Sequence, residues 1–214
     1  MPQIAIKICG VTTPDAVEAA ARGGASHVGL NYFPKSPRFL APERVAPLMT
    51  SIPAHLKRVG VLVDPDDNLI DAMIAAGGMQ VIQLHGRESS ERTASLRQRT
   101  GLEVWKVISV KTAADLASGA AYAGAADFLL YDAKTPDGAA LPGGMGHRFD
   151  WSLLAGHRPP LPWGLSGGLD AGNVAEAIRA TGAPLIDVSS GIESAPGVKD
   201  VTRIAAFCRA AQAS

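Results

Sequence analysis

The sequence alternates eight times between a short apolar run and a segment that has helical spacing or is rich in glycine and proline. Short apolar runs with many β-branched residues predict buried strands. Strands that alternate with helices predict a parallel sheet, because parallel neighbours need a crossover connection. Eight such units close as a (β/α)₈ TIM barrel, and 214 residues is near the small end of that fold's range. We therefore expect one α/β barrel domain over residues 1–214, with strands at 4–10, 27–32, 57–63, 79–84, 103–108, 127–132, 161–166 and 185–190.

The connecting segments carry recognisable helix signals. Thr13 is a suitable cap for a helix that begins at Pro14 and stops at Gly23. Pro47 predicts that the helix in 42–51 is short or broken. A doubly wound open sheet is the alternative fold, but residues 10–13 lack the glycine fingerprint expected after its first strand. Further helices are expected at 66–76, at 89–99, weakly at 112–122, near 150, at 173–181, and in a last segment with Val201, Ile204, Ala205 and Cys208 on one face.

The charge balance and the cysteines limit the classes of partner and compartment. Lys plus Arg equals Asp plus Glu at 20 each, and no stretch is a basic patch, so we expect a small-molecule partner and no nucleic acid. No apolar run is long enough to span a membrane and no signal peptide is evident, so the expected location is the cytoplasm. Cys9 and Cys208 make no disulfide framework, and the spacing around Cys208 predicts core packing. Without a cluster at metal-ligand spacing, we expect no metal and no cofactor.

Two residues interrupt the first apolar run, Lys7 and Cys9. Side chains alternate along a strand, so both point to the same face, at the end where the strand meets Gly10. A nearby ammonium favours the thiolate, which is the reactive form of cysteine. The alternative is a structural thiol, which is the usual state of cysteine in an apolar strand.

Polar residues gather where the other predicted strands end, which is the face that carries function in this fold. Arg38 is a planar, permanently charged donor suited to a carboxylate or phosphate, or else a solvated surface residue. Asp132 closes an apolar stripe, and a carboxyl group shielded from water can keep a proton and act as an acid; alternatively it caps a helix or pairs with Lys134. His85 is either a proton carrier or a hydrogen-bonded structural residue. The other residues of this set are Asn31, Asp64, Gln83, Ser166 and 187–190.

The seventh and eighth predicted strands are each followed by small residues. Glycines let backbone amides approach an anion, and these two loops often bind phosphate in barrels. We therefore expect a phosphate site there, with ordinary tight turns as the alternative. The residues concerned are Ser166, Gly167, Gly168, Ser189, Ser190 and Gly191. A further loop, 133–150, is long and rich in glycine, and we expect it to close over the site as a lid.

Several blocks taken together resemble the phosphoribosylanthranilate isomerase family of tryptophan biosynthesis. They occur in the family's order over nearly the whole chain, which makes the combination specific although each block alone is weak. The blocks are Lys7-Ile8-Cys9-Gly10, Ser36-Pro37-Arg38, Gln83-Leu84-His85-Gly86, Asp132 with Lys134-Thr135-Pro136, Phe149-Asp150-Trp151, Leu165-Ser166-Gly167-Gly168-Leu169 and Asp187-Val188-Ser189-Ser190-Gly191-Ile192-Glu193.

The resemblance implies a metal-free and cofactor-free (β/α)₈ barrel that is a monomer or homodimer. It implies an Amadori rearrangement of N-(5-phosphoribosyl)anthranilate, with Cys9 as general base, Asp132 as general acid and Arg38 on the anthranilate carboxylate. The two glycine loops match the phosphate site, and we expect Lys7, Gln83, His85 and Asp187 to bind substrate. The closest alternative is the related isomerase of histidine biosynthesis, or a dual-substrate form. These enzymes resemble a twofold repeat with an aspartate at the end of the first strand, and Cys9 in that position counts against them. A non-catalytic phosphosugar-binding barrel is the third reading, and the presence of both Cys9 and Asp132 argues against it.

Overall fold

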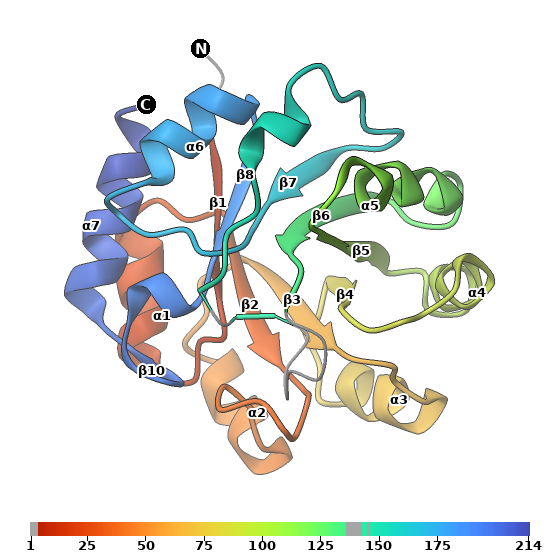
Figure 1. Cartoon of the computed structure of the whole chain (residues 1–214). Coiled ribbons are helices and arrows are strands. Elements are labelled where there is room, and N and C mark those ends of the chain that lie inside the picture. Colours follow the sequence, from red (N-terminus) through yellow and green to blue (C-terminus); the bar gives the residue numbers. More distant parts are fainter. Residues whose placement is uncertain (1–3, 136–142, 145) are drawn as a thin grey trace.

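The computed structural model of the chain describes residues 4–135, 143–144 and 146–214. Eight parallel strands form a closed barrel in sequence order, and β1 pairs with both β2 and β8 (Figure 1). The predicted fold class is therefore confirmed. The strands are β1 (Ala5–Cys9), β2 (His27–Asn31), β3 (Lys57–Leu62), β4 (Val81–Leu84), β5 (Glu103–Val110), β6 (Phe128–Ala133), β7 (Trp163–Leu165) and β8 (Leu185–Val188).

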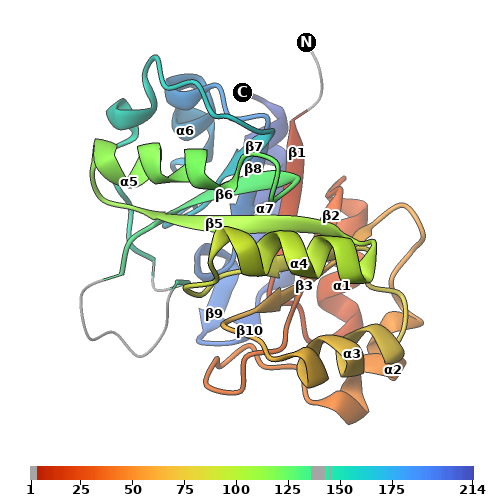
Figure 2. The same cartoon turned by 90° about the vertical axis from the view of Figure 1, so that its right-hand side faces the viewer.

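Helices surround the barrel, and Figure 2 shows α4 and α5 lying over its outer side beside β5. The α-helices are α1 (Pro14–Arg22), α2 (Pro42–Met49), α3 (Asp67–Ala75), α4 (Ser90–Thr100), α5 (Ala113–Ala117), α6 (Val174–Thr181) and α7 (Val201–Gln212). Three short 3₁₀ segments complete the connections: η1 (Ser118–Tyr122), η2 (Trp151–Leu154) and η3 (Ser190–Ile192). In the part of the chain that the structure describes, none of the helices has both the length and the apolarity to span a bilayer.

The barrel interior has an apolar half and a polar half. The apolar cluster is separate from the larger core between strands and helices. It lies inside the barrel, on the side of the amino ends of the strands. Side chains alternate between the two faces of a strand, and near the carboxyl ends of the strands this alternation turns four polar side chains into the barrel. Each of them is at most 4% exposed. The barrel therefore gathers these four polar groups at the carboxyl ends of its strands. The apolar cluster is Val59, Val81, Trp105, Val107, Leu130 and Leu185, and the polar residues are Lys7, Gln83, Asp132 and Asp187.

Some predicted boundaries were wrong. The seventh strand begins at Trp163, not at 161, because Pro162 has no N–H for the strand ladder. The weak helix of 112–122 is α5 followed by the 3₁₀ segment η1. The buried face of α7 lies further along the helix than expected: Val201 is 47% exposed, whereas Ile204, Phe207, Cys208 and Ala211 are buried. The core position of Cys208 is confirmed.

A small antiparallel hairpin after β8 was not predicted. It pairs β9 (Glu193–Ala195) with β10 (Val198–Lys199). Strands of three and two residues are too short to give a periodic signal in the sequence. Pro47 lies inside α2, which spans eight residues, in agreement with a short helix. Part of the expected lid, residues 136–142 and 145, lies outside the described residues.

Candidate active site

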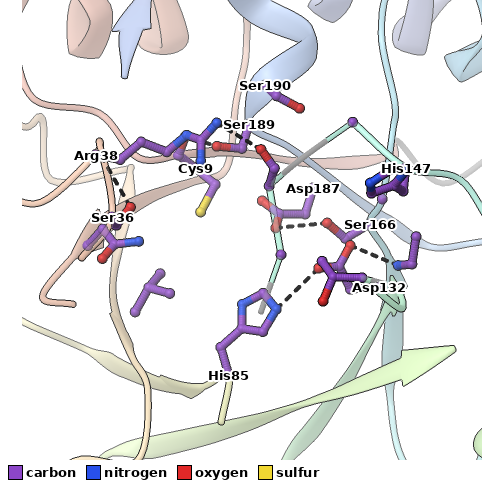
Figure 3. Close-up of a pocket in the computed structure, with 18 of the residues that line it drawn as sticks. Cys9, Ser36, Arg38, His85, Asp132, His147, Ser166, Asp187, Ser189 and Ser190 are labelled. Carbon is purple, nitrogen blue, oxygen red and sulfur yellow. Dashed lines mark hydrogen bonds and ion pairs between the residues drawn. The ribbon is translucent and has the colours of Figure 1, made fainter. Parts of the chain in front are cut away.

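A cavity opens at the carboxyl ends of the strands, as predicted for this fold. Its wall contains the thiol of Cys9, the guanidinium of Arg38 and the carboxyl groups of Asp132 and Asp187 (Figure 3). Polar side chains that are far apart in the sequence therefore meet in one place. The other predicted site residues on the wall are Gln83, His85, Ser166, Gly167, Gly168, Ser189 and Ser190; Lys7 and Gly191 are not among the lining residues.

Lys7 lies beneath the cavity and is fully buried. Its ammonium donates a hydrogen bond to Asp187 over 2.9 Å, and the two residues are direct neighbours in the β1–β8 register. Burial is the largest single effect on the pKa of Lys7 and would lower it, but the charges and hydrogen bonds of Asp187 and Cys9 together raise it. Lys7 is therefore a charged partner of Asp187, whose other oxygen lies 3.4 Å from the Ser166 hydroxyl.

Cys9 is buried at the floor of the cavity, 8% exposed. Burial raises the pKa of its thiol above the ordinary value, and the charges of Lys7 and Lys199 oppose this only in part. Lys7 does lower the thiol pKa, as expected, but Asp187 raises it and burial is the largest effect, so the net shift is upward. In the protein without ligand, the proton is held more tightly than on a free cysteine.

Asp132 is the last residue but one of β6, lines the cavity and is 3% exposed. One carboxylate oxygen accepts a hydrogen bond from the backbone N–H of Ala133 over 2.9 Å. The other lies 3.1 Å from Nε2 of His85, although the alignment falls short of a hydrogen bond. Asp132 is neither paired with Lys134 nor the cap of the next helix. Lys134 lies 3.9 Å from Asp115, and the following 3₁₀ segment η2 is capped by Asp150. The carboxyl group is thus held at the mouth of the barrel with one oxygen directed at the cavity.

Arg38 is buried, at 5% exposure, and is not a solvated surface residue. Its Nε and Nη2 donate to the two carboxylate oxygens of Glu193 over 2.7 and 2.8 Å. Nη2 also donates to the backbone carbonyl of Gly144 over 3.0 Å. A bidentate pair of this kind fixes the plane of the guanidinium. Nη1 makes no hydrogen bond among the described residues and remains available to an anion.

The two glycine loops need glycine for different reasons. Gly167 and Gly168 have φ of 95° and 61°, and Asn173 donates to the carbonyl of Gly168 over 3.0 Å. A Cβ on Gly168 would lie 2.4 Å from the side chain of Arg148, so the chain after β6 packs closely on this loop. Gly191 has a different place from the one expected. A Cβ there would lie 2.0 Å from the carbonyl of Leu169, so Gly191 lets the two loops pack together.

Two other predicted positions have distinct environments. Gln83 is 1% exposed and lines the cavity, and its Oε1 has no hydrogen-bond partner among the described residues, which leaves an acceptor for substrate. Asp64 does not line the cavity; it accepts a hydrogen bond from the N–H of Arg87 and holds the loop after β4. The described residues contain no group of three or more His, Cys, Asp or Glu side chains arranged to hold a metal ion.

The sequence analysis gave no role to Glu193 or Lys199. Glu193 joins Arg38 to Lys199, and Lys199 reaches Ser189 and the vicinity of Cys9. Each is a single polar residue in a segment without periodicity, so no pattern in the sequence indicates that they meet. Gly29, on the strand beside Cys9, was also missed; a Cβ there would lie 2.9 Å from the Cys9 sulfur.

Fold and site together define a (β/α)₈-barrel acid–base enzyme for a small anionic substrate. The chain matches the family model described as N-(5'phosphoribosyl)anthranilate (PRA) isomerase over residues 6–210. The chain belongs to the N-(5'-phosphoribosyl)anthranilate isomerase family.

Individual relatives agree with this assignment. N-(5'-phosphoribosyl)anthranilate isomerase of Zymomonas mobilis is 51% identical over 205 residues, which cover 95% of this chain and 96% of the relative. Phosphoribosyl anthranilate isomerase from Thermotoga maritima has a TM-score of 0.87 at 32% identity, with 99% of this chain and 100% of that chain covered. A phosphoribosyl anthranilate isomerase in complex with reduced 1-(o-carboxyphenylamino)-1-deoxyribulose 5-phosphate has a TM-score of 0.85 at 30% identity, with the same coverage.

Proposed function

We propose that this site converts N-(5-phosphoribosyl)anthranilate to 1-(2-carboxyphenylamino)-1-deoxyribulose 5-phosphate by an Amadori rearrangement, the third step from chorismate to tryptophan. The observation that carries the proposal is a thiol on β1 and a carboxyl group on β6 that share one cavity, with a guanidinium and two glycine loops on its wall. The chemistry of the site thus matches a substrate with an acid-labile ring and two anionic groups.

The reaction consists of proton transfers. Asp132 donates a proton to the furanose ring oxygen, the bond from that oxygen to C1′ breaks, and a protonated Schiff base with a free hydroxyl results. The Cys9 thiolate then removes the proton on C2′, and the electron pair moves through C1′ to the nitrogen. The enolamine formed becomes the ketone when C1′ gains a proton and the C2′ hydroxyl loses one. Atoms and electrons balance, so one acid and one base complete the step.

The two ends of the substrate would be held apart by different groups. The free Nη1 of Arg38 would bind the anthranilate carboxylate, and the loops that follow β7 and β8 would bind the phosphate, which their positions on the cavity wall support. Gln83 offers a buried acceptor between them. Fixing both ends positions C2′ and the ring oxygen between base and acid, which is the main advantage of a site with no reactive cofactor.

The cavity as it stands is too small for this substrate. Its free volume is about 70 Å³, whereas pockets for small molecules are typically about 300–1,000 Å³. Gly143 and Gly144 narrow the cavity, since added Cβ atoms there would lie 2.6 Å from Asp132 Oδ2 and from Arg38 Nη1. Substrate entry therefore requires this stretch to move outward, in keeping with the lid expected for the loop after β6.

The proposal is tested with Cys9→Ser and Asp132→Asn in a turnover assay on N-(5-phosphoribosyl)anthranilate. Each variant should lose roughly 10²–10⁴-fold in kcat, the usual contribution of a positioned acid or base, and should still bind a reduced product analogue. The wild-type pH profile of kcat/KM should be bell-shaped, because the base must be deprotonated and the acid protonated, and its limbs describe the pair. Near-full activity of Cys9→Ser would overturn the role of the thiol and make His85 or Asp187 the leading base.

The setting of the enzyme is part of the proposal. We infer that the chain works as one domain on this small-molecule phosphosugar in the cytoplasm, as a monomer or homodimer, without nucleic acid. A balanced charge and the absence of a spanning helix among the described residues support this inference. Sedimentation at several concentrations would separate the two oligomeric states.

A further inference from the structure

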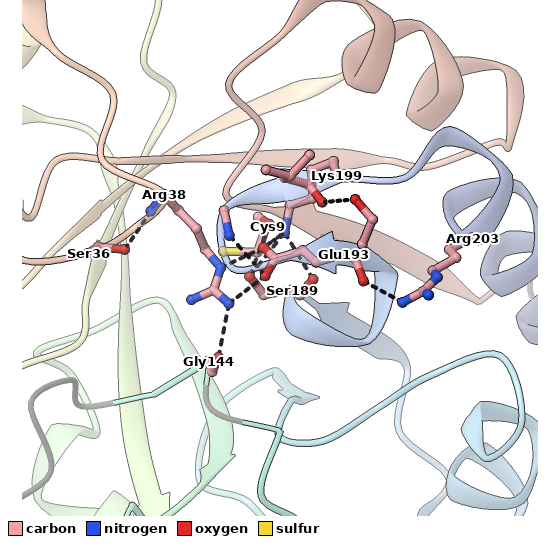
Figure 4. Close-up of polar contacts among 11 residues, drawn as sticks. Cys9, Ser36, Arg38, Gly144, Ser189, Glu193, Lys199 and Arg203 are labelled. Carbon is pink, nitrogen blue, oxygen red and sulfur yellow. Dashed lines mark hydrogen bonds and ion pairs between the residues drawn. The ribbon is translucent and has the colours of Figure 1, made fainter.

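Glu193 is a buried carboxylate whose four acceptor positions are all used. One oxygen accepts from Arg38 Nε and from Lys199 Nζ, each over 2.7 Å. The other accepts from Arg38 Nη2 over 2.8 Å and from the N–H of Gly197 over 3.2 Å. The backbone carbonyl of Glu193 also accepts from Arg203 (Figure 4). A carboxylate with this many donors cannot turn without breaking them, so it fixes the groups it holds.

Lys199 connects the same carboxylate to the strand that carries Cys9. Its ammonium is 1% exposed and donates to Glu193, to the carbonyl of Ser189 over 2.9 Å and to the hydroxyl of Ser189 over 3.2 Å. That hydroxyl donates its own hydrogen to the carbonyl of Cys9 over 3.2 Å, so it accepts from Lys199. Three donated hydrogen bonds require the three N–H groups of an ammonium. Burial lowers the pKa of Lys199 and Glu193 opposes that effect.

The charges around Cys9 do not cancel. On one side, the Lys7 ammonium is neutralised by the Asp187 carboxylate. On the other, the cations of Arg38 and Lys199 share the single carboxylate of Glu193, which leaves one net positive charge. The charge of Lys199 lowers the pKa of the Cys9 thiol, against the larger opposing effect of burial. Lys199 therefore adds a second positive charge near the thiol, beside the larger effect of Lys7.

We propose that Glu193 and Lys199 are positioning residues: Glu193 holds the Arg38 guanidinium in the plane that receives the substrate carboxylate, and Lys199 stabilises the negative sulfur of Cys9. The inference rests on the proposed roles of Arg38 and Cys9. It assigns a function to the β9–β10 hairpin, none of whose residues is among those that line the cavity.

The role of Lys199 is tested by alkylation of Cys9 with iodoacetamide at a series of pH values, followed by peptide mass spectrometry. Lys199→Met should move the midpoint of the rate profile upward by about one pH unit, since the loss of a nearby cation destabilises the thiolate. Lys199→Arg should keep the wild-type profile. The matched control is Lys57→Met, which removes a lysine from a Lys–Glu pair at the other end of the barrel and should leave the profile unchanged.

An unmoved profile in folded Lys199→Met would overturn this part of the proposal. If Lys199→Met does not fold, Lys199→Arg decides: a midpoint at the wild-type value supports a role of the charge, and an upward shift of one unit contradicts it. Because alkylation needs no turnover, this arm stands apart from the proposed reaction, whose failure would instead appear as wild-type enzyme that does not convert N-(5-phosphoribosyl)anthranilate.

The role of Glu193 is tested by the separation of KM from kcat. Glu193→Gln keeps the shape but loses the charge, and KM should rise roughly 10- to 100-fold because the guanidinium is no longer held in place. Glu193→Asp keeps the charge on a shorter side chain, so its KM should lie between those of wild type and Glu193→Gln. Lys199→Met should leave KM within about twofold, since Glu193 still binds Arg38. An unchanged KM in folded Glu193→Gln, or in Glu193→Asp if the first variant does not fold, would refute the proposal that Glu193 holds the Arg38 guanidinium.

Discussion

Replacement of Gly29 by alanine should damage the active site more than the fold. Gly29 lies on β2, directly beside Cys9 in the β1–β2 register. An added Cβ would lie 2.9 Å from the Cys9 sulfur, 3.2 Å from the Cys9 Cα and 3.2 Å from the Lys7 ammonium. Since van der Waals contact needs about 3.5–4.0 Å, the sulfur must retreat by roughly 0.6–1 Å.

The expected loss follows from that displacement. A shift of about 1 Å in a reacting group can cost on the order of 10²-fold, so kcat of Gly29→Ala should fall roughly 30- to 100-fold. Overpacking costs about 1–3 kcal/mol, partly offset by about 0.5–1 kcal/mol for replacing a strand glycine. The net cost of about 1–2 kcal/mol corresponds to a Tm lower by roughly 2–8 °C for a chain of this size.

Gly164→Ala provides the matched control for this measurement. Gly164 also faces the barrel interior, and a Cβ there would lie 2.7 Å from Leu185 Cδ2, but it touches no group of the site. Its Tm should fall by a similar amount while kcat stays within a few-fold of wild type. Steady-state kinetics and thermal melting of both variants decide the matter. Equal losses of kcat in the two variants, or an unchanged kcat in Gly29→Ala, would refute the reasoning.

Four other results are expected. Arg38→Ala should mainly raise KM, roughly 10- to 100-fold from the loss of charge-assisted hydrogen bonds, and an unchanged KM would place the carboxylate elsewhere. Inorganic phosphate should compete with substrate, and Gly168→Val should weaken both, because a Cβ there meets Arg148 and φ is positive; non-competitive inhibition would mean that phosphate binds at another place. Chelators should leave activity unchanged, and loss that one metal restores would contradict a metal-free reaction. Burial and the nearby charges of Lys7 and Lys57 lower the pKa of His27 from 6.5 to about 4. As pH falls, the unfolded chain therefore binds this proton before the folded chain does. Up to about 3 kcal/mol of stability present above pH 6.5 should be lost as pH falls toward 4. The urea midpoint of His27→Gln should change less with pH than that of wild type.

Strand and helix placement was predictable where a local pattern exists. The apolar runs located all eight barrel strands, and the cap at Thr13 and the core position of Cys208 follow from spacing alone. The hairpin that carries Glu193 was missed, and so was the late start of the seventh strand. In both cases the deciding factor is a few backbone hydrogen bonds, which leave no periodic signal.

The sequence by itself determined which residues gather at the carboxyl ends of the strands, because strand order and side-chain alternation are local properties of the chain. It also carried the family motifs. Only the tertiary structure decided how those residues are paired and charged. Closure of the barrel brings β8 against β1, so Asp187 neutralises Lys7 across 180 positions of sequence. The hairpin after β8 then brings Lys199 to the other side of Cys9. Coulomb energies depend on distance and burial, and both are set by the closed fold.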